Sequence, residues 1–168
     1  MLIPNVAKTW APVGETPVIE HPYKRDKISL ISGVSVSPKQ QRLGLYYLLF
    51  YDNIGQEEVV LFLRELLRHL RGQVVVLLDN STIHKGEPIE DLQHHHPRLH
   101  VEYFPAYAPE LNPDEGVWCQ AKTSLANGCS KDLEELTEDV MRAVDGIKNS
   151  PDKLRACIAA SELPSFLR

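Results

Sequence analysis

The sequence predicts one α/β domain in which helices cover both faces of a mixed β-sheet. A chain of 168 residues that is 43% hydrophobic is long enough to bury a single core. Two neighbouring apolar runs near the start are typical of a β-hairpin. After them, apolar segments with strand character alternate with segments of helical periodicity, which is the pattern of parallel strands joined by crossover helices.

The hairpin is predicted from the segments at 27–37, "KISLISGVSVS", and 42–53, "RLGLYYLLFYDN". The polar stretch "SPKQQ" connects them, and Gly33 interrupts the first segment where a β-bulge is expected. The segment at 55–72 has apolar residues at helical spacing, an acidic start and a basic end, which together predict a helix.

The rest of the chain reads as strand, helix, strand and then three helices. These elements are expected at residues 74–79, 86–96, 98–105, 114–125, 130–149 and 151–161. Ser130 is the expected N-cap of the long amphipathic helix. The single domain of residues 1–168 therefore divides into a proline-rich extended lead-in (1–26), a core (27–125) and C-terminal helices (126–168).

Composition and charge argue against several classes of protein. No window approaches the roughly 18 apolar residues of a membrane-spanning helix, and the N-terminal segment lacks the features of a secretory signal. A net charge of −5 argues against a module that holds nucleic acid by electrostatics alone, but it suits an enzyme that recruits metal ions. Three cysteines without a CxxC pair are typical of reduced thiols in a cytoplasmic protein.

Two carboxylates stand where predicted elements reach solvent. Asp79 follows an apolar run, and Glu115 lies in the first turn of the helix predicted to start at Asp114. Ligands gather at strand ends in α/β sheets, and converging carboxylates bind the divalent cations used in phosphodiester chemistry. The same residues also fit ordinary turn and capping chemistry, so the pattern alone leaves both interpretations open.

Other motifs point less clearly to chemistry. The histidine run at 94–96 invites a metal interpretation, but consecutive side chains on a helix point in different directions, which favours a solvated helix end. Neither a GxSxG nucleophile elbow nor a GK[ST] phosphate loop occurs in the sequence.

Two longer stretches together resemble a known family. "LLDNSTIHKG", followed by "YFPAYAPELNPDEGVWCQAK", resembles the catalytic domain of mariner-like bacterial insertion-sequence transposases, within the DDE superfamily endonucleases. The segment "TWAPVGETPVI" is similar to the part of these proteins that follows their first catalytic strand. The resemblance spans about residues 1–125, and the C-terminal helices are compatible with it.

The resemblance implies a ribonuclease-H-like fold, with a five-stranded mixed sheet between helices. It implies that Asp79 and Glu115 are catalytic carboxylates that bind Mg²⁺ or Mn²⁺ in a two-metal site, with Asp114 at a variable position. The resemblance also implies that four residues lie close to the metals or contact DNA: Asn80, His84, Asn112 and Lys122. Trp118 matches a buried aromatic residue of the family.

The activity implied by the resemblance is metal-dependent cleavage of double-stranded DNA at transposon ends, followed by strand transfer to target DNA. A homodimer that acts at the bacterial nucleoid, without any membrane association, is the implied setting. Two alternatives remain open: a non-catalytic remnant that serves as a dimerisation or interaction module, and a ribonuclease-H-type nuclease that acts on RNA–DNA hybrids.

The start of the chain departs from the family pattern. In the family, an aspartate precedes the segment that resembles residues 9–19, whereas here no Asp or Glu precedes Glu15. We therefore expect an N-terminally truncated domain with most of its opening strand missing, an incomplete two-metal site and impaired activity. Asp52 is a poor replacement, because its strand normally leads into the first helix. Pairing of the exposed sheet edge with another chain is the expected consequence.

Overall fold

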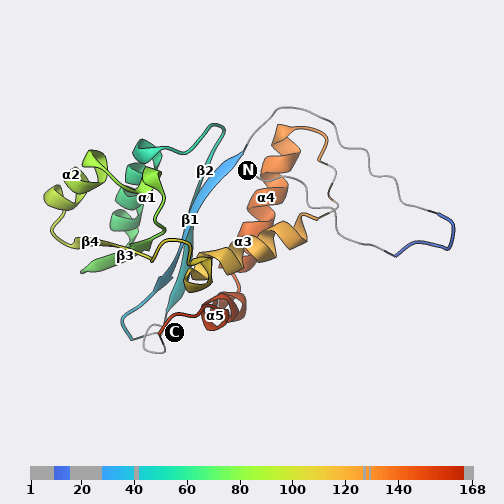
Figure 1. Ribbon diagram of the computed structural model, residues 1–168. Helices are drawn as coiled ribbons and strands as arrows, with labels where there is room; N and C mark the ends of the chain where they lie inside the picture. The colour runs from blue at the N-terminus through green and yellow to red at the C-terminus, as the bar shows by residue number, and fades with distance from the viewer. Residues whose placement is uncertain (1–9, 16–27, 40–41, 127, 129, 165–168) are drawn as a thin grey trace.

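Figure 1 shows the computed structural model, which describes residues 10–15, 28–39, 42–126, 128 and 130–164. The predicted lead-in lies largely outside these described residues. Within its described part, the side chains of Trp10 and Val13 are fully exposed. None of the described helices combines the length and the apolar character that crossing a membrane requires.

The predicted hairpin consists of strands β1 (Ser29–Val36) and β2 (Leu43–Phe50), which pair in an antiparallel ladder. Pairing is one to one throughout, with Gly33 opposite Tyr46, so the predicted bulge is wrong. Gly33 faces the ring of Phe62 on the next helix. A Cβ atom added at Gly33 would lie 3.5 Å from this ring, which is an ordinary contact, so the regular ladder also has room for a larger residue.

The next part of the chain builds a parallel strand pair covered by two helices. It comprises α1 (Gln56–His69), β3 (Val74–Leu78), α2 (Glu87–His95) and β4 (Leu99–Tyr103), with a short 3₁₀ helix, η1 (Thr82–His84), after β3. The strands β3 and β4 pair in parallel register. Apolar residues of α1, α2 and both strands form one core: Val59, Val60, Phe62, Leu63, Leu66, Leu67, Val74, Ile89, Leu92 and Leu99.

The C-terminal part is helical. A 3₁₀ turn, η2 (Pro109–Leu111), leads into α3 (Pro113–Ser124), which is followed by α4 (Leu133–Lys148) and α5 (Pro151–Ala160). These helices and the hairpin bury a second core: Leu45, Val117, Ala121, Val140, Val144, Ile147, Leu154 and Cys157.

The predicted N-cap of α4 is wrong by two residues. The side chain of Asp132 accepts a hydrogen bond of 2.9 Å from the backbone N–H of Glu135. Ser130 instead donates its hydroxyl to Asp139, at 3.0 Å. Serine and aspartate are both good N-cap residues. Asp132 is the cap because it directly precedes the helix, so its side chain reaches the free N–H groups of the first turn.

The hairpin lies between the two cores (Figure 1). Because successive strand residues point to opposite faces, Ile31 and Leu48 pack towards α1, while Leu30, Val34 and Leu45 pack towards α3, α4 and α5. Helices therefore cover both faces of the hairpin, as predicted.

The sheet differs from the expected one in its continuity. Within the described residues, β1 pairs with β2 and β3 pairs with β4, but no ladder joins the two pairs. The mixed character is as predicted, with one antiparallel and one parallel pair. The outer face of β3 stays uncovered, with Val75 64% exposed and Leu77 39% exposed.

Candidate active site

The strand β3 delivers Asp79 to the surface, as predicted. The parallel pairing continues to the end of the strand, where the backbone N–H of Phe104 donates to the carbonyl oxygen of Leu78 at 2.8 Å. Asp79 is the next residue, and its side chain is 58% exposed. The strand, whose last residue Leu78 is half-buried, thus ends directly at an accessible carboxylate, which is followed by the exposed Asn80.

His84 folds back onto Asp79 through the η1 turn. Its Nδ1 atom lies 2.6 Å from Oδ1 of Asp79, and only 13% of the histidine side chain is exposed. The same carboxylate oxygen accepts a hydrogen bond of 2.9 Å from the backbone N–H of Ser81, two residues later, which forms an Asx-turn. The structure therefore joins two of the predicted site residues, and it confirms that Asp79 also has the local turn role.

The backbone around His84 is held by the end of β4. The hydroxyl of Tyr103 donates to the carbonyl oxygen of His84 at 2.8 Å, and the Lys85 ammonium lies 5.6 Å from the centre of the tyrosine ring. Burial, and secondly the negative charge of Glu90, raise the pKa of Tyr103. The tyrosine therefore stays protonated and remains a donor over the physiological range.

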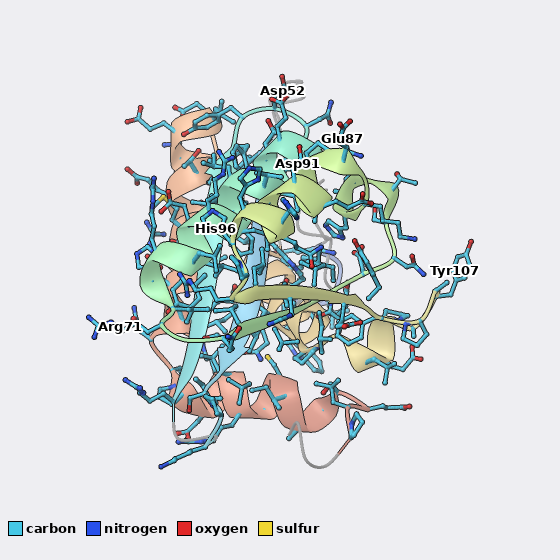
Figure 2. All side chains as sticks on the ribbon, turned by 90° about the vertical axis from the view of Figure 1, so that its left-hand side faces the viewer. Asp52, Arg71, Glu87, Asp91, His96 and Tyr107 are labelled. Carbon is cyan, nitrogen blue, oxygen red and sulfur yellow. The ribbon has the colours of Figure 1, made fainter. Side chains whose placement is uncertain are left out.

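The loop after β4 leads to the second predicted carboxylate. Tyr107 has a φ of 60° and is fully exposed, and Figure 2 shows its side chain projecting away from the body of the molecule. After η2, Asn112 caps α3, because its side chain accepts the backbone N–H of Asp114 at 3.0 Å. Glu115 lies in the first turn and is exposed.

Lys122 lies two turns further along α3 and is also exposed. A spacing of seven residues puts Lys122 on the same side of a helix as Glu115. Asp52, the weaker substitute for a missing carboxylate, lies in Figure 2 far from Tyr107 and thus from the loop that leads to Glu115.

One polar cluster beside this site was not predicted. Asp114 turns away from solvent, where its Oδ2 atom accepts the hydroxyl of Ser32 at 2.6 Å and the indole N–H of Trp118 at 2.9 Å. Its Oδ1 atom is buried without a partner. Burial raises the pKa of Asp114, the two hydrogen bonds lower it, and the charge of Glu115 raises it further. The Asp–Trp spacing of four residues is the signal in the sequence, but nothing there indicates Ser32.

The donor chemistry suits a hard divalent cation only in part. Asp79 and Glu115 are exposed carboxylates that follow the same end of the β3–β4 pair, one directly and one through a loop. No hydrogen bond or ion pair joins them, and the described residues contain no group of three His, Cys, Asp or Glu side chains placed to hold a metal ion. Among the described residues, these two carboxylates offer oxygen ligands but do not make a complete protein-made site.

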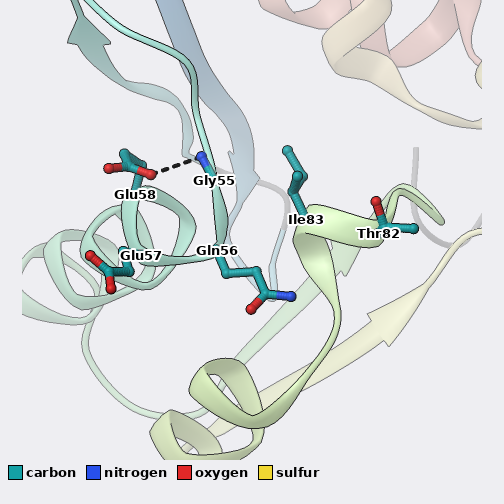
Figure 3. Close-up of a pocket in the computed structure, with 6 residues that line it drawn as sticks. All are labelled: Gly55, Gln56, Glu57, Glu58, Thr82 and Ile83. Atoms are coloured by element: carbon teal, nitrogen blue, oxygen red, sulfur yellow. Dashed lines mark hydrogen bonds between the residues drawn. The ribbon is translucent and has the colours of Figure 1, made fainter.

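A shallow hollow lies between the start of α1 and the η1 turn (Figure 3). Its lining includes Gly55, Glu58, Thr82 and Ile83. Glu58 is already engaged, because its carboxylate accepts the backbone N–H of Gly55 at 2.8 Å. None of the predicted site residues lines this hollow, so it does not extend the candidate site.

Comparison with protein families gives one match, and comparison with curated proteins gives none. The family described as DDE superfamily endonuclease matches residues 2–137. No curated protein matches the sequence significantly.

Solved structures give matches over nearly the whole chain. The crystal structure of the Mos1 strand transfer complex matches with a TM-score of 0.57 and 20% identity, over 98% of this chain and 52% of that chain. The Mos1 transposase paired-end complex with left transposon end gives a TM-score of 0.58 and 20% identity, over 96% and 52%. The Mos1 mariner paired-end complex with Mn gives 0.55 and 19%, over 96% and 53%.

The chain thus spans about half the length of these Mos1 chains. At this level of identity the likeness establishes the fold. It is the mixed α/β, ribonuclease-H-like fold that the element order and the resemblance predict.

Proposed function

The chain belongs to the DDE superfamily endonucleases, and we propose that it is the catalytic core of a mariner-like DNA transposase of the bacterial insertion-sequence type. The reaction is metal-dependent cleavage of phosphodiester bonds at transposon ends, followed by strand transfer. One observation carries the proposal: Asp79 and Glu115 are exposed carboxylates that follow the same end of the β3–β4 pair, one directly and one through a loop, in a fold shared with the Mos1 complexes.

In this proposal Asp79 and Glu115 hold Mg²⁺ or Mn²⁺, and the Mos1 paired-end complex with Mn supports that choice of ion. A bound divalent ion supplies Lewis acidity, which activates the attacking hydroxyl and stabilises charge on the phosphate. His84 donates to Asp79 and thereby fixes the orientation of that carboxylate. We expect weak metal binding and slow turnover, because the described residues contain no group of three His, Cys, Asp or Glu side chains placed to hold the ion.

The same comparison supports a DNA substrate, because the Mos1 transposase was solved with a transposon end. Lys122 lies on the Glu115 side of α3 and is exposed, so we assign it to a phosphate of double-stranded DNA. Asn80 and Asn112 flank the two carboxylates in sequence, and we place them beside the metal or the DNA backbone.

Nicking of supercoiled plasmid in the presence of Mn²⁺ tests this function. We expect slow nicking that disappears in Asp79→Asn and in Glu115→Gln, while Glu110→Gln, a nearby exposed carboxylate on the same loop, retains it. Nicking that persists in both site variants would show that the activity belongs to a contaminant. Faster degradation of an RNA–DNA hybrid than of duplex DNA would support a ribonuclease-H-type activity instead.

A second candidate function rests on a different observation. Val75 and Leu77 expose apolar side chains on the uncovered face of β3, and exposed apolar patches mark interaction sites. This favours a dimerisation or interaction module if catalysis is lost. Sedimentation velocity separates the two functions. A dimerisation module sediments as a dimer, and Val75→Glu returns it to a monomer. An independent catalytic core keeps its nicking activity in Val75→Glu.

A further inference from the structure

The residue before the proposed metal ligand Glu115 is Asp114, whose carboxyl group is directed into the protein. Ser32 in the middle of β1 and Trp118 one turn later on α3 both donate to the same oxygen of Asp114, at 2.6 Å and 2.9 Å. The bond to Ser32 joins positions 82 residues apart in sequence. A single carboxylate therefore ties the first turn of α3 to the hairpin.

The residue after Glu115 is fixed from a second side. Gly116 packs so closely on α5 that a Cβ atom added to it would lie 3.2 Å from both Cβ and Sγ of Cys157. One turn later, the side-chain amide of Gln120 donates to that same sulfur atom at 3.0 Å. The helix is thus held against β1 through Asp114 and against α5 through Gly116 and Gln120.

These two anchors leave α3 little freedom to rotate about its axis. Neighbouring residues on a helix point about 100° apart, since a turn holds about 3.6 residues. With Asp114 and Gly116 both directed into the protein, Glu115 between them points outward, and it is exposed. The direction of this carboxylate is therefore set by its two neighbours in sequence.

We infer that Asp114 is a positioning residue, whose hydrogen bonds to Ser32 and Trp118 orient Glu115 towards the metal shared with Asp79. This inference rests on the proposed function, because it assigns Asp114 a role through Glu115. Asp114 does not itself touch the ion, since its carboxyl is directed into the protein and is occupied by two donors.

The energetics favour a positioning role over a purely structural one. The Oδ1 atom of Asp114 is buried without a partner, and burial of such a polar atom destabilises a fold. An apolar side chain at this position would avoid that cost. Buried polar groups that destabilise the fold are expected at functional sites, and Asp114 directly precedes the proposed metal ligand Glu115.

Four variants of the full chain test the inference. Asp114→Leu removes the oxygen that accepts both hydrogen bonds, and Ser32→Ala removes one donor with little change in volume. Asp114→Asn keeps a carbonyl oxygen for both donors and serves as the conservative control. Asp132→Ala removes the carboxylate that caps the start of α4, where its hydrogen bond is to Glu135 and not to α3, and it controls for general destabilisation.

Two readouts are used, of which the second needs no metal. The first is the dissociation constant for Mn²⁺ by calorimetry. The second is the rate at which Cys119 reacts with a disulfide reagent, in a Cys129→Ser background. Cys119 is exposed and lies one turn after Glu115 on the same side of α3, whereas Cys157 is buried.

We expect Asp114→Leu to fold with a lower melting temperature, because the Ser32 hydroxyl and the Trp118 indole N–H lose their acceptor. We also expect it to weaken Mn²⁺ binding about tenfold or more, the range seen when residues that orient metal ligands are removed. In Asp114→Leu, the rate at which Cys119 reacts with the disulfide reagent changes several-fold. Ser32→Ala changes both the Mn²⁺ affinity and the Cys119 rate in the same direction as Asp114→Leu. Asp114→Asn and Asp132→Ala change neither quantity.

The inference is overturned if Asp114→Leu and Ser32→Ala keep the parent values of both readouts. It is also overturned if Asp114→Asn loses as much affinity as Asp114→Leu, since the charge and not the geometry would then matter. If the parent chain binds no Mn²⁺, the proposed function fails, and the Cys119 rates alone decide whether Asp114 orients this face of α3.

Discussion

At the scale of single residues, Asp79 has two roles that different variants separate. Its carboxylate closes a turn with the backbone N–H of Ser81, and it receives the ring N–H of His84. An asparagine can accept the same two hydrogen bonds, since its side-chain oxygen occupies the same place. The negative charge is therefore not required by the fold, although it is required by a cation.

We expect Asp79→Asn to change the free energy of unfolding by less than about 0.5 kcal/mol, as for most surface substitutions. His84→Ala removes the donor to the exposed carboxylate and is expected to cost about 1 kcal/mol. Urea denaturation monitored by circular dichroism measures both. A large loss of stability in Asp79→Asn would show that the carboxylate serves the fold and would weaken its assignment to a metal.

Tyr47 gives a prediction about pH that is independent of the proposed site. Its hydroxyl donates to Asp145 at 2.9 Å. Burial, the hydrogen bond to Asp145 and the charge of Asp145 together raise the pKa of Tyr47 from 10.0 to about 12. Between these values the folded protein keeps a proton that the unfolded chain loses, so deprotonation favours unfolding.

The stability that Tyr47 contributes is thus complete below pH 10 and is lost as the pH rises towards 12. We expect the parent chain to lose stability relative to Tyr47→Phe over this interval, as measured by urea denaturation at a series of alkaline pH values. The comparison between the two proteins removes the contribution of other tyrosines and of lysines. Parallel curves for both proteins would contradict the account.

The sequence predicts the exposed site residues better than the buried one. Asp79 and Glu115 lie at the ends of predicted elements, and this position is visible in the pattern of apolar residues. Asp114 also begins a helix, but its environment is made by Ser32, which lies far away in the sequence. Contacts of this kind depend on the packing of whole elements and leave no local pattern.

At the scale of elements, the position of α3 depends on its close approach to α5. The missing side chain of Gly116 leaves room for Cys157, where an added Cβ atom would be within 3.3 Å of three cysteine atoms. Gly146 in α4 is the natural comparison, because it is also helical and an added Cβ atom would meet nothing within 4 Å.

We expect opposite effects from the same substitution at these two glycines. Gly116→Ala forces α3 away from α5 and costs about 1–3 kcal/mol. Gly146→Ala stabilises the protein by about 0.5–1 kcal/mol, because alanine restricts the unfolded chain without a clash. Thermal and urea denaturation of both variants checks the pair. Stabilisation by Gly116→Ala would mean that the two helices are not closely packed.

The order and type of the elements follow from the sequence, whereas their finer features do not. Helical periodicity and apolar runs predict each described α-helix and each described strand, whereas the 3₁₀ helices η1 and η2 are not predicted. The bulge at Gly33 and the cap at Ser130 are wrong, because the regular pairing of β1 with β2 and the backbone of Glu135 decide what those residues do. Both corrections come from spatial neighbours and not from local propensity.

At the scale of the whole molecule, the hairpin organises the domain. It separates a core under α1 and α2 from a core under α3, α4 and α5, and its residue Ser32 donates a hydrogen bond to Asp114 of α3. The two proposed ligands come from opposite sides of this arrangement, since Asp79 follows β3 and Glu115 belongs to α3. Metal binding that needs both residues would therefore report on the relative position of the two halves.

The measurement that tests the account most directly is a calorimetric titration of Mn²⁺ into the parent chain, Asp79→Asn and Glu115→Gln. We predict weak binding in the parent and its loss in each single variant, because the two carboxylates share one ion. Retention of the parent affinity in either variant, or no binding by the parent, would contradict the claim that these residues form one metal site.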